Sequence, residues 1–391
     1  MTVESLNAPP RHSNNLVRLG RVLAVFALLF IFLLGVKGLG DGFKLLSRDF
    51  VEVFFRATSN PFVGLIVGLL ATTLVQSSSV TTSMIVGLVA APENPLPLAN
   101  AIPMIMGANI GTTVTNTLVS LAHIARKQEF RRAFAVATCH DFFNYMSVLI
   151  LLPLEMATGY LRRSAEALTE TLTGLGTGGV DYDSPVSSIL GAAFKPIRAG
   201  VAAVIESQGG RATAIILLSG VLIFTSLMLL VRLMRTLLQS RVEVGLMNVL
   251  GRSGVLSIVV GIVVTIMVQS SSITTSLLVP LAGAGIITLE HAFPITVGAN
   301  IGTTVTALLA SLAVTGPNAA AGVTIALIHL LFNLSGTLLI YPIPAIRRLP
   351  LRAARALAAV AVRSRAMAFA YVFGLFYLLP AVVAAIDIIF F

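Results

Sequence analysis

Three short motifs occur twice in this chain of 391 residues, in the same order each time. Val-Gln-Ser-Ser-Ser at 75–79 returns at 268–272, and Thr-Thr-Ser follows each copy after one residue. Gly-Ala-Asn-Ile-Gly-Thr-Thr-Val-Thr at 107–115 returns unchanged at 298–306. A fold that accommodates this sequence must therefore contain two versions of one structural unit.

The third motif is less strictly repeated. It is His-Asp-Phe-Phe-Asn at 140–144 and His-Leu-Leu-Phe-Asn at 329–333. The copies are separated by 193, 191 and 189 positions (Gln76 to Gln269, Gly107 to Gly298, His140 to His329), and a nearly constant separation of three ordered motifs excludes chance. Internal repeats of this kind are typical of transporter folds. We expect these segments: 1–60, a cytoplasmic segment and first transmembrane helix; 61–155, the first repeat; 156–253, an external linker, a crossing helix and a cytoplasmic basic loop; 254–344, the second repeat; 345–391, a basic cytoplasmic segment and a last transmembrane helix.

Apolar runs place these units in a membrane. Hydrophobic residues make up 56% of the chain and charged residues 11%, which is about half the charge of a soluble domain. The first apolar run is long and lacks a small-residue cleavage site, so we expect a retained helix rather than a signal peptide. We expect an all-α, multi-pass protein of the cell (plasma or inner) membrane, with the clearest apolar windows at Val22–Leu39, Phe134–Leu154, Ala214–Val231, Leu256–Val268, Val323–Tyr341 and Met367–Phe391.

The net charge of +10 fits the same interpretation, because the basic residues gather in short segments between apolar runs. This distribution argues against a nucleic-acid partner. The single cysteine, Cys139, lies in an apolar run and excludes an intrachain disulfide.

Loop charges predict the orientation of the repeats. The second motif of the first copy is followed by the basic segment Arg126–Arg132, whereas 314–318 in the second copy carries no charge. One loop then faces the cytoplasm and the other does not, so we expect inverted repeats; two tandem units of the same orientation are the alternative. The amino terminus and Arg347–Arg365 are expected in the cytoplasm, the linker around Arg162–Arg211 outside, and the end of the last span outside.

The Gln-Ser-Ser-Ser segments interrupt apolar runs that are too short to span a bilayer, such as Pro61–Val75 and Val80–Ala91. Irregular backbone at membrane depth is tolerated only against protein or water. We therefore expect each segment to form the tip of a re-entrant helical hairpin. Half-helix ends there offer free N–H groups to an anion and free carbonyls to a cation. The alternative is a small-residue face for helix packing.

The second motif contains Gly-x-x-x-Gly, which alone predicts close helix contact. Packing does not explain the asparagine between the glycines or the threonines after them, which have oxygens suited to an ion shell. In the third motif, the histidines are more typical of satisfied structural residues than of ligands. Asp141 differs, because a lone carboxylate in a transmembrane run is by default a functional candidate and would repel an anion. A sodium site is its natural role, with a helix cap or a paired charge as the alternative.

These residues resemble the type II sodium/phosphate cotransporter family. The resemblance rests on the paired motifs, on the stretch Gln128–Tyr160 with Glu-Phe-Arg-Arg-Ala-Phe at 129–134, and on Pro-Leu-Arg at 350–352, and it covers about Pro61 to Leu379. Animal members have a large disulfide-bearing external loop and further hydrophobic sequence after the position of Phe391. This linker has no cysteine, so a bacterial-type member is expected, and regulatory and trafficking properties are not implied.

The resemblance implies sodium-coupled import of inorganic phosphate, with both Gln-Ser-Ser-Ser segments binding phosphate and sodium. It also implies electrogenic transport, since electrogenic relatives have Asp where this chain has Asp141 and electroneutral ones have Gly. We expect phosphate at Ser77, Ser78, Ser79, Ser270, Ser271, Ser272, Asn109 and Asn300. We expect sodium at Gln76, Gln269, Thr81, Thr112, Thr113, Asp141, Asn144, Thr274, Thr303, Thr304 and Asn333.

None of the motifs contains Lys or Arg, so the expected site is neutral apart from Asp141. Desolvating phosphate there is costly, and bound sodium can supply the missing positive charge. Arg131 or Arg132 would weaken this argument if either reached the site. A sodium symporter for another anionic solute, a phosphate-responsive regulatory protein and a channel remain alternatives. No nucleotide loop, metal-ligand cluster or catalytic set is recognisable, so we do not expect an enzyme. We expect sodium as the coupling ion and no organic cofactor. We expect the protein to lie in the lipid bilayer, and a homodimer is an open possibility.

Overall fold

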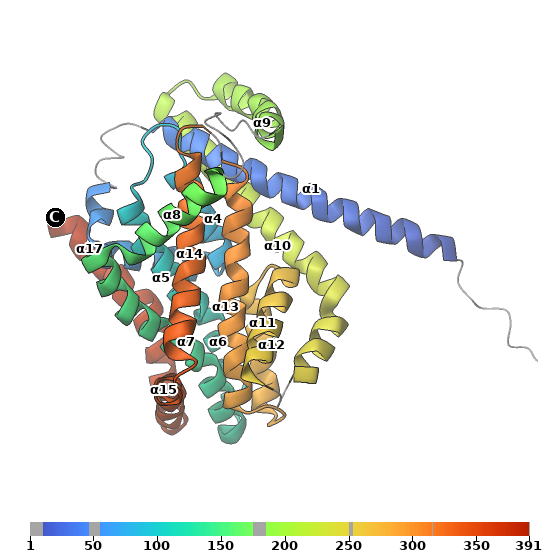
Figure 1. The fold of residues 1–391 in the computed structure, drawn as a ribbon, viewed down its shortest axis with the longest axis vertical. Helices are drawn as coiled ribbons and strands as arrows, with labels where there is room; N and C mark the ends of the chain where they lie inside the picture. The colour runs from blue at the N-terminus through green and yellow to red at the C-terminus, as the bar shows by residue number, and fades with distance from the viewer. Residues whose placement is uncertain (1–10, 47–54, 175–184, 250–252, 315, 391) are drawn as a thin grey trace, which may run out of the picture.

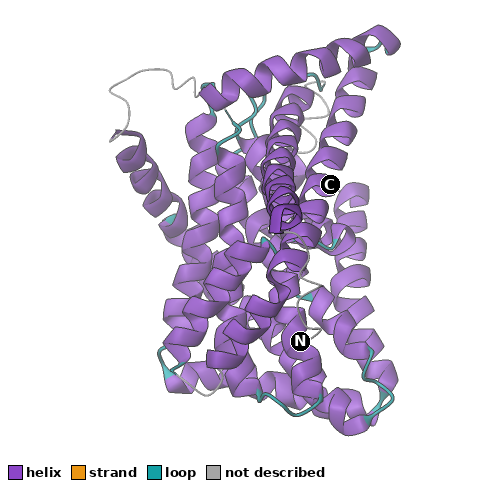
Figure 2. Ribbon diagram, turned by 90° about the vertical axis from the view of Figure 1, so that its right-hand side faces the viewer, coloured by secondary structure: helices purple, strands orange, loops and turns teal. Residues whose placement is uncertain are grey.

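The computed structural model describes residues 11–46, 55–174, 185–249, 253–314 and 316–390. These residues form helices joined by short connections, and no strand occurs among them (Figure 2). The expected all-α class is confirmed. Two large apolar clusters and a small third one form the core of the described residues.

Six helical stretches are long and apolar enough to cross a membrane: Leu19–Lys44, Lys127–Thr158, Gln208–Met234, Leu289–Ser311, Ala319–Ile340 and Arg365–Val383. They lie in α1 (Arg11–Lys44), α7 (Lys127–Thr158), α10 (Gln208–Val249), α13 (Leu289–Ser311), α14 (Ala319–Ile340) and the last helical stretch, which comprises α16 (Arg365–Phe369), η1 (Ala370–Leu378) and α17 (Leu379–Phe390). The protein is thus a multi-pass membrane protein. In Figure 1, α13 and α14 lie side by side through the middle of the bundle.

One expected apolar window is too short to be a span. Leu256–Val268 lies in α11 (Gly254–Val268), which has 15 residues and is too short to cross. The sixth long apolar helix is instead α13, which contains the second motif. Polar Asn and Thr side chains interrupt the hydrophobic pattern there, so the window was missed. Most residues of the helix are buried against protein, where such side chains are tolerated.

Both Gln-Ser-Ser-Ser segments separate two short helices, as expected. In the first copy these are α3 (Pro61–Val75) and α4 (Ser78–Val89); in the second they are α11 and α12 (Ser271–Gly283). Asn60 accepts a hydrogen bond from the N–H of Phe62 to cap α3, and Ser253 caps α11 through the N–H of Leu256. Hairpin-like pairs of short helices therefore occur at corresponding places.

The second motif holds each hairpin by close helix contact. It forms the end of α5 (Leu98–Thr112) and the start of α6 (Val114–Leu121) in the first copy, but a continuous α13 in the second. A Cβ on Gly107 would lie 1.8 Å from the carbonyl oxygen of Leu65, and one on Gly298 would lie 2.0 Å from that of Ile258. The glycines therefore have the packing role that Gly-x-x-x-Gly predicts, α5 against α3 and α13 against α11.

The two copies exchange contacts. Helix α4 packs on α13, while α12 packs on α6 and α7. Beyond each third motif comes an amphipathic helix that packs on the other copy: α8 (Tyr160–Gly174) lies on α14, and α15 (Pro344–Arg363) lies on α7. Much of the expected external linker is thus helical, since α8 is followed by α9 (Pro185–Val204). The Gly-rich part at 175–179 lies outside the described residues. Figure 1 places α9 and α15 at opposite ends of the bundle.

Candidate functional site

The two helix breaks have the same unusual backbone. Gln76 ends α3 with φ 57° and ψ 26°, and Gln269 ends α11 with φ 57° and ψ 27°. This left-handed conformation disfavours a residue with a Cβ. Among the described residues only Asn94 also adopts it without being glycine. Strain retained at corresponding positions of both copies marks the breaks as functional candidates.

Each glutamine side chain holds its break in the same way. Nε2 of Gln76 donates to the carbonyl of Thr73 at 2.5 Å, and Oε1 accepts from the hydroxyl of Thr115 at 3.0 Å. In the second copy Gln269 donates to Ile266 at 2.6 Å and accepts from Thr306 at 3.2 Å. Both expected sodium ligands therefore have their side-chain amides engaged in bracing the hairpin.

The serines lie at the starts of α4 and α12. Ser77 and Ser270 are the N-caps, and their side chains accept from the N–H groups of Val80 and Ile273. Ser78, Ser79 and Ser271 are buried, and Ser272 is half-buried. First-turn N–H groups and hydroxyls thus gather at two buried helix N-termini, which favour negative charge.

The two hairpins meet at Thr306. Its hydroxyl donates to Oε1 of Gln269 and lies 3.4 Å from the hydroxyl of Ser79, which donates to it. One residue of the first serine motif and one of the second are therefore joined through a single threonine. This contact between copies is what a site shared by both motifs requires.

The threonines of the expected sodium set are already hydrogen-bonded within their own helices. Each hydroxyl donates to a carbonyl three or four residues earlier in the chain. The residues are Thr81, Thr112, Thr113, Thr274, Thr303 and Thr304. Because the proton is directed into the helix, the oxygen keeps a lone pair that can accept a cation, so this bonding is compatible with both a structural and a ligand role.

Four asparagines from both copies form a buried polar cluster. Nδ2 of Asn300 donates to Oδ1 of Asn144 at 2.7 Å, and Nδ2 of Asn333 donates to Oδ1 of Asn109 at 3.2 Å. Nδ2 of Asn144 also donates to the carbonyl of Asn109 at 2.8 Å. Second and third motifs of opposite copies are thus paired. The structure brings together four residues that the sequence divided between phosphate and sodium.

His140 extends this cluster toward α12. Its Nε2 lies 2.5 Å from Oδ1 of Asn300, and its Nδ1 lies 3.3 Å from Nδ2 of Asn116. Since Asn116 can only donate through Nδ2, the network assigns the neutral tautomer with the proton on Nε2. Asn116 in turn accepts from Thr275 at 2.9 Å. The expectation of a satisfied structural histidine fits His140. It does not fit His329, whose ring nitrogens have no hydrogen-bond partner in the described part of the chain.

Asp141 is fully buried beside this network. Oδ2 accepts from the hydroxyl of Tyr371 on η1 at 2.7 Å. Oδ1 has no hydrogen-bond partner among the described residues, although the hydroxyls of Thr113 and Thr117 lie next to the carboxylate. A buried carboxylate without a positive neighbour is costly, so this group of oxygens is chemically suited to a monovalent cation.

Sequence reasoning missed the tyrosines of the last helical stretch. Besides Tyr371 at Asp141, the hydroxyl of Tyr377 accepts from Nε2 of Gln76 at 3.2 Å. Both lie in η1, a π-helical segment, and such segments occur frequently at functional sites. A tyrosine in an apolar window carries no ligand signature, so only the three-dimensional arrangement reveals its role.

The arginines lie away from the site. Nε of Arg132 donates to the carbonyls of Ala282 and Gly283, at the opposite end of α12 from Ser271. Twelve residues of helix separate the two ends by roughly 18 Å. Among the described residues no group of three or more His, Cys, Asp or Glu side chains could hold a metal ion. The oxygen donors at Asp141 are hydroxyl and carboxylate groups.

Comparison with known proteins gives a consistent result. A family model described as Na+/Pi-cotransporter matches residues 31–177 and 222–342, one part for each copy. Sodium-dependent phosphate transport protein 2A of Rattus norvegicus is 36% identical over 457 residues, covering 98% of this chain and 71% of the relative. The 2A protein of Oryctolagus cuniculus is 37% identical over 427 residues (92% and 66%), and the 2B protein of Homo sapiens is 32% identical over 455 (95% and 66%). No solved structure matches the chain.

Proposed function

Because this chain belongs to the Na+/Pi-cotransporter family, we propose that it imports inorganic phosphate by sodium-coupled secondary active transport. The observation that carries the proposal is the pair of helix breaks at Gln76 and Gln269, whose serine-capped N-termini are joined across the copies at Thr306. Paired half-helix N-termini in internal repeats are how many transporters bind an anionic substrate.

Phosphate is held in this proposal by the first turns of α4 and α12. The hydroxyls of Ser78, Ser79 and Ser271 are buried and that of Ser272 is half-buried, and Ser79 reaches the other copy at Thr306. Ser77 and Ser270 contribute as caps, because they orient the free N–H groups of each first turn. Asn109 and Asn300 support the site through the asparagine cluster.

In this proposal sodium is held by side-chain oxygens of the helices around the phosphate site. Asp141 with Thr113 is the best-supported position, because the carboxylate is buried and Oδ1 lacks a hydrogen-bond donor in the described structure. The other expected ligands are Gln76, Gln269, Thr81, Thr112, Asn144, Thr274, Thr303, Thr304 and Asn333.

Coupling follows from electrostatics. The motifs contain no Lys or Arg, and Arg132 is anchored at the far end of α12, so helix ends and bound sodium must compensate the charge of phosphate. The anion then binds well only together with its cations. If Asp141 binds one of them, the cycle moves net positive charge inward and is electrogenic.

Inverted repeats and alternating access complete the proposal. The start of α13 shares a cavity with the start of α7, whereas the end of α13 leads into the start of α14, so α7 and α14 begin at opposite ends of the bundle. Equivalent helices that run in opposite directions support an axis in the membrane plane. Two such copies can rock around a fixed central site.

The test is radiolabelled phosphate uptake into proteoliposomes with and without an inward sodium gradient. Wild-type uptake should require the gradient, and Ser78→Ala and Ser271→Ala should each reduce it strongly while the protein remains folded. Uptake of another anion but not phosphate would identify a different symporter. Sodium-dependent phosphate binding without uptake would identify a regulatory protein, and gradient-independent flux a channel. We propose that the protein is not an enzyme and uses no organic cofactor. Size analysis in detergent tests whether it forms a homodimer.

A further inference from the structure

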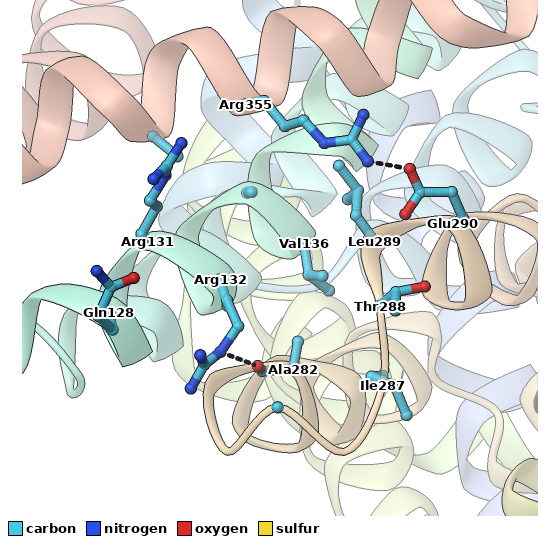
Figure 3. A pocket seen from close by; sticks show the side chains of 13 residues that line it. Gln128, Arg131, Arg132, Val136, Ala282, Ile287, Thr288, Leu289, Glu290 and Arg355 are labelled. Carbon is cyan, nitrogen blue, oxygen red and sulfur yellow. Dashed lines mark hydrogen bonds and ion pairs between the residues drawn. The ribbon is translucent and has the colours of Figure 1, made fainter.

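A basic cavity of about 430 Å³ lies far from the serine motifs, where the start of α7, the turn between α12 and α13, and α15 meet. Figure 3 shows Arg131 and Arg132 on α7 and Arg355 on α15 around it, with Glu290 from the start of α13. The lining thus contains three guanidinium groups and one carboxylate, which leaves an excess of positive charge at this cavity.

The three arginines differ in how they are held. Arg132 is fixed by the carbonyls of Ala282 and Gly283, through Nε and Nη2, which leaves Nη1 free to donate. Arg355 pairs with Glu290 through Nη2. Arg131 forms no hydrogen bond or ion pair with the described residues, so its charge is uncompensated beside the other two.

The repeat shows that these charges are not needed for packing. By the separation of 189 positions, Arg131 and Arg132 correspond to Ala320 and Ala321 at the start of α14. The start of α14 packs at the end of α4 as the start of α7 packs at the end of α12, since Asn318 donates to the carbonyl of Ala91. The same helix junction therefore forms with alanines. The positive-inside rule accounts for basic residues at this end of α7, but not for their convergence on one cavity.

We propose that this cavity is a binding site for a phosphate oxyanion, separate from the site at the serine motifs. The guanidinium fork matches two phosphate oxygens, and one arginine already fixed by backbone carbonyls loses little freedom on binding. The same chemistry is offered by free inorganic phosphate and by the headgroup of an anionic phospholipid. The proposal does not depend on the transport function, because the cavity lies at the opposite end of α12 from Ser271.

Binding of a lipid headgroup is supported by α15. This helix buries Leu351, Ala354 and Ala358 on one face and carries arginines on the other, which is the pattern of a helix lying in a membrane interface. Basic residues there attract anionic lipid. Binding of free phosphate is supported by the size of the cavity, which has room for a phosphate ion.

The experiment uses the full chain in lipid nanodiscs and compares wild type with Arg131→Gln, which removes the uncompensated charge without breaking a hydrogen bond. The matched control is Arg348→Gln, which removes an exposed arginine of α15 that does not line the cavity. One arm titrates inorganic phosphate into sodium-free phosphatidylcholine nanodiscs by calorimetry. The other measures immobilisation of spin-labelled phosphatidylglycerol by electron paramagnetic resonance.

Arg131→Gln should weaken binding about tenfold in at least one arm, while Arg348→Gln should change it less than about twofold. A response to phosphate identifies the free ion as the ligand, and a response to phosphatidylglycerol identifies the lipid. In the phosphate arm, binding that persists in Ser78→Ala but weakens in Arg131→Gln belongs to the cavity and not to the serine site. Wild type that binds in neither arm, or variants that behave alike, would overturn the proposal.

Discussion

The two copies form the same hairpin break but give the third motif different tasks. Gln76 and Gln269 have nearly identical φ and ψ angles. The lengths of their corresponding side-chain hydrogen bonds agree to within a few tenths of an ångström. Around α7, by contrast, the first copy gathers Asp141, a doubly bonded His140 and Asn116. The second copy has Leu330, an unbonded His329 and Ala307 at the corresponding positions. The hairpin is thus common scaffold, and the electrostatic chemistry belongs mainly to the first copy.

Equivalent substitutions in the hairpin contact should destabilise the two copies equally. Gly107→Ala and Gly298→Ala each place a Cβ at about 2 Å from a backbone carbonyl oxygen, which a side-chain rotation cannot relieve. Each should destabilise the fold by about 3 kcal/mol or more and lower the yield of folded protein. Thermal unfolding in detergent measures this effect.

Gly220→Ala is the matched control, because a Cβ there meets nothing within 4 Å. It should leave the unfolding temperature unchanged or slightly raised. A large loss in only one of the two motif variants would show that the copies do not share this contact.

The two copies should differ in their role in sodium coupling, and Asp141 is where this difference can be tested. Asp141→Gly should remove one coupled sodium and make uptake insensitive to voltage while phosphate binding persists, and Asp141→Asn should weaken the same sodium site. Each elementary charge that crosses 100 mV contributes about 2.3 kcal/mol, so a negative-inside potential should accelerate wild-type uptake but not that of Asp141→Gly. Proteoliposomes with imposed potassium-diffusion potentials provide the measurement. Equal voltage dependence in wild type and Asp141→Gly would exclude Asp141 as the electrogenic ligand.

Sequence alone was enough for the backbone plan. Repetition located both hairpins, because a polar break between two short apolar runs has few solutions at membrane depth. It failed at α13, whose Asn and Thr residues lower the hydropathy of a helix that is buried by protein. It also did not identify α8 and α15 as helices, because an amphipathic helix and a charged loop have similar composition.

The site was only partly predictable for a related reason. The motifs named the residues of the asparagine cluster but not their pairing across copies, such as Asn333 with Asn109, since pairing depends on how the copies pack. Tyr371 gave no signal, because it belongs to no repeat and its partner is 230 positions away. Contacts between distant segments are set by tertiary packing and leave no spacing to detect.

The two histidines should differ in their effect on stability. His140→Leu removes the hydrogen bonds to Asn300 and Asn116 and leaves Oδ1 of the first and Nδ2 of the second without a partner, so it should cost about 1–2 kcal/mol. His329→Leu breaks no hydrogen bond that the described structure contains and replaces a buried polar ring by an apolar side chain, so it should be neutral or stabilising. Unfolding temperatures of the two variants decide the matter. A larger loss in His329→Leu would show that His329 has a bonding role of its own.

The smallest expected effect concerns the last helical stretch, which stands outside the repeats. The Tyr371 hydroxyl donates to Oδ2 of Asp141, so its proton and a sodium ion at Oδ1 compete for the negative charge of one carboxylate. Tyr371→Phe removes one hydrogen bond and keeps the ring, which should raise the apparent sodium affinity about two- to tenfold and leave the phosphate KM unchanged. Sodium-activation curves of uptake measure this shift. Tyr160→Phe is the control, because its hydroxyl contacts Ser335 away from Asp141. A lowered sodium affinity in Tyr371→Phe would instead mean that the hydroxyl orients the carboxylate for the ion, which would make the tyrosine a supporting residue rather than a competitor.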